Sequence, residues 1–450
     1  MKARDTIKVA AAVVVAGLIR LTKWTAPRPV TKHLRLAADG TVEKVSTAAQ
    51  LYTGKVTRLE CTPASFVKAL ANIGPNDCLS YGVPVDDFAT KVMSMKSFAA
   101  LNMPPNALTR TKEAMTWSSG PGLLMIDHDP GDRSYAPQEL LDAIYAFCPA
   151  LRTTAHIWNS SASSCLRNTV TKKEVRGIEG QRVYIVVADA TDIPRAGDVL
   201  FKRSWLAGQG HIKISKAGWL LVRSVLDASV FQPNRIDYCA PAICESPLAQ
   251  RKPLPKLHGN QSLVLDTRLA LSDLSAAELT KYYLLVASAK AQQQAAAAGI
   301  RASYIQQRVD VHVANGMDSA IALKIVSTAM DRKVLHANFI LTTEDGLTVT
   351  VGQLLADKNT WHGKRFADPV EPDYHDDFRV ARAYLDGPGR PYIHSFAHGG
   401  QRYLLSHAVV TIRLITGDRS QFMPQMVRVF DEQGTFYRRG EALVAIADEF

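Results

Sequence analysis

The chain has 450 residues, of which 47% are hydrophobic and 21% are charged, and this length suffices for two to four domains with ample core. Its formal net charge of +11 indicates a polyanionic partner and favours nucleic acid over membrane. The six cysteines form no CxxC pair, which argues against a structural zinc site or a disulfide framework and favours a reducing cytoplasm.

The first 30 residues are expected to form an apolar helix. The run from Val9 to Ile19 resembles the apolar part of a signal peptide, but it is too short to span a bilayer. Arg20 and Lys23 follow where a cleavage site needs small neutral residues. A helix packed on the body of the protein or on a partner is therefore favoured over an export signal, and no membrane partner is expected.

Short β-like segments come next, and their alternating apolar residues predict a hairpin around the Asp39-Gly40 turn. Helical patterns follow at 63–72, where Thr62 or Ser65 can cap the helix, and at 85–100.

A short buried strand is predicted between Gly122 and Ile126, and two aspartates follow it directly. Asp127 and Asp129 are two residues apart, so they project from the same face of the strand. Two such carboxylates repel each other unless a cation lies between them, and Mg²⁺ or Mn²⁺ prefers oxygen ligands. These residues alone leave two alternatives open: a metal site and a solvated junction between strand and loop.

The next 80 residues alternate between helices and strands. Residues 137–147 predict an amphipathic helix, 182–187 a central strand and 192–206 another helix. A strand at 156–158 leads into the serine-rich loop 159–164, whose hydroxyls suit phosphate oxygens, although a plain polar loop has the same composition.

Two adjacent strands are predicted at 208–215 and 219–227, with a turn at Ala217-Gly218. The second strand ends in Asp227, the natural third carboxylate, and the loop after it carries Arg235, whose guanidinium suits bidentate phosphate contact.

The Pro- and Lys-rich segment 247–255 is interpreted as a linker. A capping box at Ser275 and Glu278 predicts a long helix that Gly299 closes, and further helical patterns continue to about residue 333.

The C-terminal part is predicted to contain β-structure. Strands are expected at 337–342 and 347–351 around the Asp345-Gly346 turn, and again at 426–430 and 442–446. Between them, His394 and His398 beside Asp368 could ligate a metal, but a structural or DNA-contacting role is favoured because the context is a strand and turn rather than a helix. The chain has no GxxxxGK[ST] phosphate loop, so ATP-driven motor activity is not expected.

The order of these features resembles the archaeo-eukaryotic primase superfamily, the primase-polymerases of plasmids and phages. Its first motif is a hydrophobic strand ending in Asp-x-Asp, matched by Asp127 and Asp129. Its third motif is a hydrophobic residue and Asp, then a loop with an aromatic residue and Asn-Arg, matched by the segment from Leu226-Asp227 to Asn234-Arg235.

The second motif of that family, Ser-x-His, contacts the phosphates of the incoming nucleotide and is matched less closely. Ser161 and Ser163 offer the serine element, and Arg182 stands where related proteins often carry histidine. His211 is a rival candidate, although it lies close to Asp227 in the sequence.

The resemblance covers roughly residues 30–250 and implies an α+β fold with an RRM-like antiparallel sheet joined to a second α/β half. The predicted organisation is an N-terminal helix (1–30), a catalytic domain (31–255), a helical module (256–335) and a small α+β accessory domain (336–450).

The resemblance also implies a primase-polymerase that makes and extends primers on single-stranded DNA from NTPs or dNTPs, in phage or plasmid replication. Two Mg²⁺ or Mn²⁺ ions would be held by Asp127, Asp129 and Asp227. The nucleotide would be bound by Ser161, Ser163, Arg182, His211 and Arg235. A helicase is a candidate partner, because one often follows such domains.

Two alternatives remain at this level. The chain could be a DNA-binding replication protein of this fold that has lost activity, which the imperfect second motif favours. It could also be a metal-dependent phosphoesterase, but those enzymes need further His and Asp clusters, and residues 130–230 contain only His156 and His211 as histidines.

Overall fold

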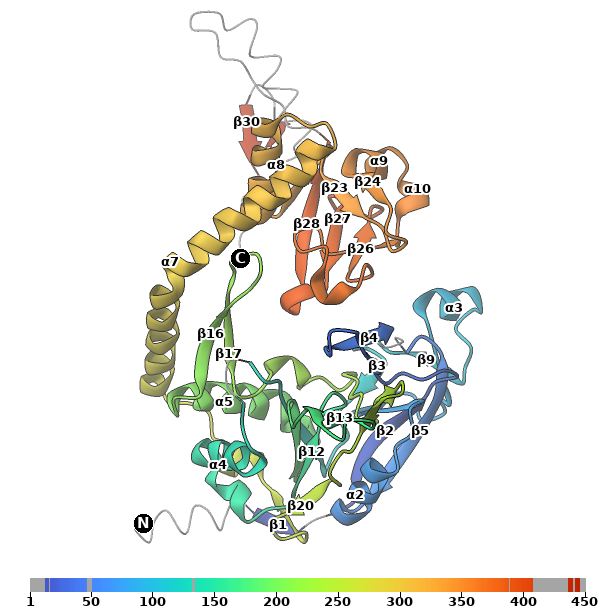
Figure 1. Ribbon diagram of the computed structural model, residues 1–450, viewed down its shortest axis with the longest axis vertical. Coiled ribbons are helices and arrows are strands. Elements are labelled where there is room, and N and C mark those ends of the chain that lie inside the picture. The colour runs from blue at the N-terminus through green and yellow to red at the C-terminus, as the bar shows by residue number, and fades with distance from the viewer. Residues whose placement is uncertain are drawn as a thin grey trace, which may run out of the picture. The chain divides into compact units, whose positions relative to one another are not determined.

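The computed structural model describes residues 13–15, 17–46, 51–131, 134–387, 389–407, 436–439 and 442–445, and the fold is mixed α+β as predicted. The chain divides into two compact units, and Figure 1 labels their elements. Unit 1 comprises Met1–Lys213 and Leu221–Gln292, and unit 2 comprises Ile214–Leu220 and Gln293–Phe450. This division differs from the boundaries that the sequence analysis placed at residues 30, 255 and 335.

A six-stranded sheet forms the centre of unit 1. Its strands are β1 (Val13–Val15), β11 (Gly122–His128), β12 (His156–Ser160), β15 (Gln181–Val187), β20 (Lys256–His258) and β21 (Leu263–Leu265). β15 pairs antiparallel with β11 on one side and with β12 on the other. Because it is enclosed by both neighbours, β15 is buried at nearly every position, which confirms the predicted central strand.

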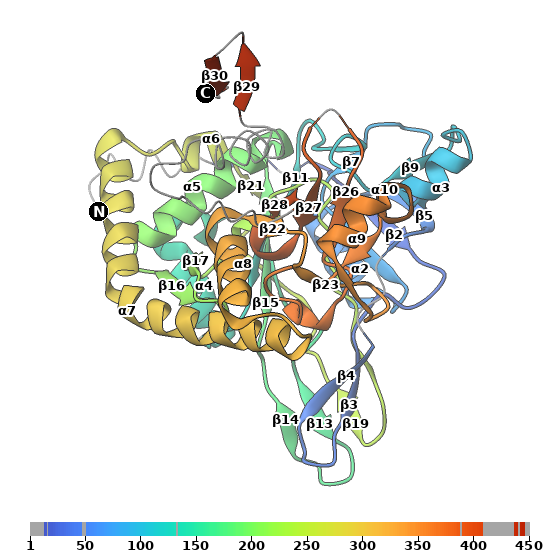
Figure 2. The same ribbon diagram turned by 90° about the horizontal axis from the view of Figure 1, so that it is seen from above.

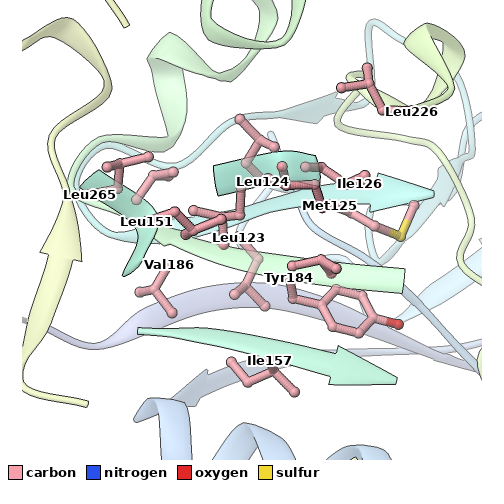
Figure 3. Packing of buried hydrophobic residues seen from close by; sticks show 14 of the residues in the cluster. Leu123, Leu124, Met125, Ile126, Leu151, Ile157, Tyr184, Val186, Leu226 and Leu265 are labelled. Carbon is pink, nitrogen blue, oxygen red and sulfur yellow. The ribbon is translucent and has the colours of Figure 1, made fainter. Parts of the chain in front are cut away.

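The predicted helices after the Asp strand are confirmed as α4 (Pro137–Phe147) and α5 (Ile193–Leu206). The apolar face of α4 is buried in the main core of unit 1, and Asp192 precedes the first turn of α5 as predicted. Figure 3 shows how Leu124 and Ile126 of β11 pack in this core together with Leu226, the residue before Asp227.

Unit 1 contains a second, five-stranded sheet in the order β6-β2-β5-β8-β9. Its strands are β2 (Ile19–Thr25), β5 (Gly54–Cys61), β6 (Asp77–Ser80), β8 (Lys91–Met93) and β9 (Ala107–Thr109). Helix α2 (Pro63–Ala71) is confirmed, with Thr62 and Ser65 forming a capping box. The helix predicted at 85–100 is confirmed only for α3 (Met95–Ala100), because Lys91–Met93 is a strand.

The predicted N-terminal helix is wrong where the structure describes it, because β1 and β2 are strands. Ile19 and Leu21 are buried, while Arg20 between them is exposed and pairs with Glu60 at 2.9 Å (Nε to Oε1). This alternation is the period of a strand with one buried face, and pairing with β5 and β6 stabilises it. Residues 1–12 and 16 lie outside the described part of the chain.

The predicted linker at 247–255 is also wrong, because it contains β19 (Leu248–Gln250), which pairs with β13 (Leu166–Asn168). Leu248 is buried, and the Gln250 side-chain amide donates to the carbonyls of Ala162 and Ser164. Two small sheets, β14-β13-β19 and β18-β3-β4, lie side by side (Figure 2). The predicted hairpin at Asp39-Gly40 is confirmed as β3 and β4.

Unit 2 begins within the long helix α7 (Ala276–Ala314). The capping box of Ser275 and Glu278 is confirmed, but Gly299 does not end the helix. Helix α8 (Ser319–Arg332) follows, with Asp318 as its N-cap.

A five-stranded sheet in the order β22-β28-β27-β26-β25 completes unit 2 together with the confirmed hairpin of β23 and β24. The sheet strands are β22 (Val334–His336), β25 (Arg365–Phe366), β26 (Ala381–Tyr384), β27 (Tyr392–Ser395) and β28 (Gln401–Ser406). The predicted strand at 426–430 lies outside the described residues, and the one at 442–446 is confirmed as β30.

The remaining elements are short. They are β3 (His33–Leu36), β4 (Val42–Ser46), β7 (Val83–Pro84), β10 (Met115–Thr116), β14 (Glu174–Arg176), β16 (Gly210–Ile214), β17 (Leu220–Ser224), β18 (Ile243–Cys244), α6 (Thr267–Ala270), β23 (Ile340–Thr342), β24 (Thr348–Thr350), α9 (Val351–Ala356), α10 (Lys358–Trp361), β29 (Phe436–Arg439) and β30 (Ala442–Ala445). In the described part of the chain, none of the helices combines the length and apolarity that crossing a membrane requires.

The core around β11 gives a direct test of the fold. Leu124 is fully buried, whereas Leu254 is 77% exposed. We expect Leu124→Ala to lower the free energy of unfolding by about 3 kcal/mol, because it removes buried methyl groups and leaves a cavity. Leu254→Ala, the matched control, should change it by less than about 0.5 kcal/mol in urea unfolding. Equal effects of the two substitutions would contradict the burial of β11.

Candidate active site

The aspartates predicted as catalytic lie on two neighbouring segments of unit 1. Asp127 is the penultimate residue of β11, Asp129 follows the strand, and Asp227 comes three residues after β17. The backbone N–H of Asp227 donates to the carbonyl oxygen of Asp127 at 3.0 Å. The His128 ring also approaches the Val225 carbonyl, with 2.9 Å from Nδ1 to the oxygen. The segment before Asp227 therefore lies beside β11 on the side away from β15, as an additional edge of the sheet.

Arg182 lies opposite Asp127 in the register of β11 and β15. Its Nε is 3.4 Å from Oδ1 of Asp127, and its Nη1 is 2.9 Å from Oδ1 of Asp237. The Asp237 side chain is fully buried, and the hydroxyls of Tyr81 and Tyr184 both donate to its other oxygen. Arg182, predicted to bind the nucleotide, is thus held between two carboxylates with only 12% of its side chain exposed.

Asp127 carries the most informative pKa shift of the site. Burial raises its pKa to about 6, although the Arg182 guanidinium opposes the rise. The negative charges of Asp129, Asp237 and Asp227 add to the rise, so each of these carboxylates lies close enough to repel that of Asp127. A bound cation would relieve this repulsion.

Two half-buried lysines lie near carboxylates of this region, Lys32 near Asp129 and Lys252 near Asp237. Burial lowers the pKa of Lys32, and the charges of Lys44 and Arg182 lower it further, while the nearby carboxylate of Asp129 opposes the shift. Burial likewise lowers the pKa of Lys252 to about 8, with the charge of Arg182 as the next cause. Amines held next to carboxylates in this way are suited to the phosphates of a nucleotide.

The serine-rich loop is joined to this cluster through Lys32, whose Nζ donates to Oγ of Ser163 at 3.0 Å. Ser161 is buried, and its hydroxyl lies 3.1 Å from the Ser164 hydroxyl and 3.4 Å from that of Ser163. The structure therefore brings Ser163 to the site, whereas Ser161 helps to form the loop.

His211 of β16 is exposed and lies near the loop after β11. Its Nε2 is 4.0 Å from the position that a Cβ on Gly131 would take, and its charge acts on His128. Burial lowers the pKa of His128, so its ring is neutral at pH 7.

Arg235, the fifth predicted nucleotide-binding residue, is exposed on the turn before Asp237. Its charge acts on Tyr238, the neighbour of Arg110, and no described interaction connects it with Asp127, Asp129 or Asp227. The structure thus brings Ser163 to Lys32 and His211 to the loop after β11, but it leaves Arg235 outside the described cluster.

The predicted metal site is matched only in part. Carboxylates suit Mg²⁺ and Mn²⁺, but both oxygens of Asp227 already accept hydrogen bonds from Ser229, at 2.9 Å from its N–H and 2.7 Å from its hydroxyl. Asp129 is exposed. Within the described residues, no three His, Cys, Asp or Glu side chains are gathered closely enough to hold a metal ion.

The other candidate metal ligands, in unit 2, have structural partners. Asp368 is buried and accepts hydrogen bonds from the backbone of Val370 and Glu371 and from the Ser395 hydroxyl. Nε2 of His398 lies 3.1 Å from Oε2 of Glu371. The contacts of Asp368 and His398 are thus with protein groups, and the alternatives of a structural or a DNA-contacting role for this tract stay predictions.

Sequence reasoning missed Asp237, Lys32 and Lys252 as members of the site. Asp237 lies in the loop that the sequence singles out only for Arg235, and Lys252 lies in the segment 247–255 that the sequence predicts as a linker. A signal for Asp237 existed, because a carboxylate between the apolar Ile236 and Tyr238 must find a buried cation or hydrogen-bond donors.

Comparison with protein-family models gave no match, and neither the curated proteins nor the solved structures compared with the chain gave a significant one.

The buried pair of Arg182 and Asp237 is testable by substitution. We expect Asp237→Asn to lower the free energy of unfolding by about 3 kcal/mol, because it leaves the buried guanidinium without one of its charge partners. Asp129→Asn, an exposed control with the same chemical change, should cost less than about 0.5 kcal/mol. Urea unfolding measures both. Similar values for the two variants would contradict the buried ion pair.

The raised pKa of Asp127 predicts a pH effect on stability in the presence of EDTA. The folded-state pKa of Asp127, about 6, exceeds the ordinary value of 3.8, so folding takes up a proton between these two pH values. The stability that this protonation contributes is fully present below pH 3.8 and is lost as the pH rises through 6. Between pH 5 and pH 7 the wild type should lose about 1 kcal/mol more stability than Asp127→Asn. Parallel pH profiles for the two proteins would show that Asp127 titrates normally.

Proposed function

We propose that this chain is a primase-polymerase of the archaeo-eukaryotic type, which transfers nucleotides to a primer on a single-stranded DNA template. The observation that carries the proposal is the pairing of Asp227 with Asp127 through a backbone hydrogen bond. This hydrogen bond joins the Asp127 and Asp227 segments beside β11, at one edge of the central sheet. Along the chain, the elements around this sheet include β11, α4, β12, β15 and α5 in that order. That order, with β15 between β11 and β12, is the one expected of an RRM-like catalytic half.

In the proposed reaction, the 3′-hydroxyl oxygen of the primer attacks the α-phosphorus of a nucleoside triphosphate. The new P–O bond forms as the bond to the β-phosphate oxygen breaks, and pyrophosphate leaves. The hydroxyl proton would pass to solvent, and Asp127, Asp129 and Asp227 would favour its loss by holding the ions. Lys32, Lys252 and the Ser163 hydroxyl would bind the triphosphate.

The metal requirement remains part of the proposal. Asp127, Asp129 and Asp227 are the residues that would hold Mg²⁺ or Mn²⁺, and the ions would supply Lewis-acid activation and charge stabilisation. For Asp227 this requires its carboxylate to exchange hydrogen bonds with Ser229 for the ion. The proposal includes NTPs or dNTPs as substrates, phage or plasmid replication as the setting, the cytoplasm as the location and a helicase as a partner.

A second candidate function is DNA binding by a catalytically inactive protein of the same fold. It is favoured by Arg182, which is held by Asp127 and Asp237 instead of facing a nucleotide, and by the lack of a three-ligand cluster among the described residues. Against it, a carboxylate whose pKa is raised by burial and by the charges of neighbouring aspartates is costly to maintain in a protein with no use for a cation.

The deciding experiment is incorporation of labelled nucleotides on circular single-stranded DNA with Mg²⁺ or Mn²⁺, with and without a primer. We expect Asp127→Ala/Asp129→Ala to lower incorporation at least about 1000-fold, because it removes the carboxylates on which the transition state depends. Glu344→Ala/Asp345→Ala removes two exposed acids from unit 2 and is the charge-matched control.

Products from the wild type and the control, but not from the Asp127/Asp129 variant, would support the proposal, and products without a primer would make the protein a primase. If the wild type is inactive while it still binds single-stranded DNA, the inactive binder becomes the better explanation.

A further inference from the structure

The five-stranded sheet of unit 2 has two chemically different faces. One face is apolar and belongs to the core of unit 2, where α8 and α9 lie against the sheet. Its buried residues are Leu335, Phe366, Ala381, Ala383, Ile393, Tyr403 and Leu405. Because side chains alternate along a strand, the residues between these project from the other face.

A row of cationic and imidazole side chains crosses this second face. Arg365 lies opposite Arg382, Arg382 opposite His394, and His394 opposite Arg402. The row therefore runs across the neighbouring strands β25, β26, β27 and β28, of which Figure 1 labels the last three. At the usual spacing between strands, the row is about 14 Å long.

Aromatic rings lie next to this row on the same face. Tyr384 is opposite Tyr392, and their rings are stacked with centroids 5.0 Å apart and planes at 15°. The Arg402 guanidinium lies over the Tyr392 ring at 4.2 Å. Phe396, 52% exposed, contacts the edge of the His394 ring with 4.8 Å between centroids.

Two arginines on this face, Arg382 and Arg402, have no close acidic partner among the described residues, whereas the charge of Arg365 acts on Asp377. In the part of the chain that the structure describes, neither Arg382 nor Arg402 lies within 4.0 Å of a carboxylate oxygen. Arg382 instead donates to the Gly363 carbonyl at 3.1 Å, and Arg365 donates to that of Arg379 at 3.0 Å. Arg365 and Arg382 are like charges directly opposite one another, which destabilises a sheet, and an anionic ligand on this face would relieve that repulsion.

We propose that this face of the unit 2 sheet binds single-stranded nucleic acid. Bases of any sequence stack on exposed aromatic rings, while arginines contact the phosphates between them. Tyr384, Tyr392 and Phe396 provide the stacking surface, and Arg382 and Arg402 provide the charges. Unpaired strands are favoured over duplex, because the bases of a duplex are already stacked on one another and cannot stack on the tyrosines.

This inference goes beyond the proposed polymerase site and does not depend on it. All of its residues belong to unit 2, whereas Asp127, Asp129 and Asp227 belong to unit 1. A protein that lacks catalytic activity would still bind single strands through this face.

The experiment measures binding of the full chain to fluorescently labelled dT20, rU20 and a 20-base-pair duplex by anisotropy across a salt series. We expect Arg382→Ala/Arg402→Ala to weaken dT20 binding and to reduce the slope of log K against log salt by about 1.4, since two phosphate contacts are lost. Arg332→Ala/Lys358→Ala removes the same charge from exposed positions elsewhere in unit 2 and should leave the slope unchanged.

The tyrosines distinguish stacking from simple charge attraction. Tyr384→Ala/Tyr392→Ala should weaken binding roughly tenfold per ring, whereas Tyr384→Phe/Tyr392→Phe keeps the rings and should bind as the wild type does. Circular dichroism confirms that each variant is folded. The arms with dT20 and rU20 report whether DNA or RNA is preferred.

The proposal is wrong if the Arg382/Arg402 variant binds dT20 with the affinity and salt slope of its control, or if the alanine and phenylalanine variants of the tyrosines bind equally. Stronger binding of duplex than of dT20 would also overturn it. Asp127→Ala/Asp129→Ala should retain dT20 binding through unit 2, so failure of the polymerase proposal and failure of this one give different results.

Discussion

The burial of Arg182 is the constraint on which the centre of unit 1 depends. A guanidinium placed on the middle strand of a sheet loses its hydration, and only nearby carboxylates and hydrogen-bond acceptors can offset that cost. Asp127 supplies one carboxylate from the adjacent strand, and Asp237 supplies the other from a distant loop. Of the tyrosines that bind Asp237, Tyr184 lies on β15 with Arg182 and Tyr81 directly follows β6, so a single buried charge joins segments that are far apart in the sequence.

The same arrangement sets the chemistry of the carboxylates. Asp127 is close to Arg182 and yet has a raised pKa, because burial and the neighbouring aspartates outweigh the favourable charge. The half-buried Lys32 and Lys252 have lowered pKa values, because partial burial disfavours their charged form. A site of opposed, poorly solvated charges is suited to a ligand that carries both a cation and phosphates, such as a metal-bound nucleotide.

Unit 2 shows a different use of charge. Its sheet keeps one apolar face for the core and gathers arginines and aromatic rings on the other, where they are partly exposed. In unit 1 Arg182 is balanced by the carboxylates of Asp127 and Asp237, whereas Arg382 and Arg402 have no described carboxylate partner. Arg182 therefore stabilises the fold, while Arg382 and Arg402 stay at least partly exposed.

The sequence by itself determined the elements whose residues report local physics. The amphipathic spacing of α4, the capping residues of α2 and α7, and the continuous apolar run of β15 all led to correct predictions, because each depends on neighbours within a few residues. The sequence also selected Asp127 and Asp227, since an aspartate that ends a hydrophobic run is visible without a structure. Only the tertiary structure decided that β2 is a strand, that the segment of Leu248 is a strand rather than a linker, and that Arg182 pairs with Asp237. Strand pairing and buried ion pairs depend on partners tens of residues away, and no local pattern specifies which partner a strand or a charge will find.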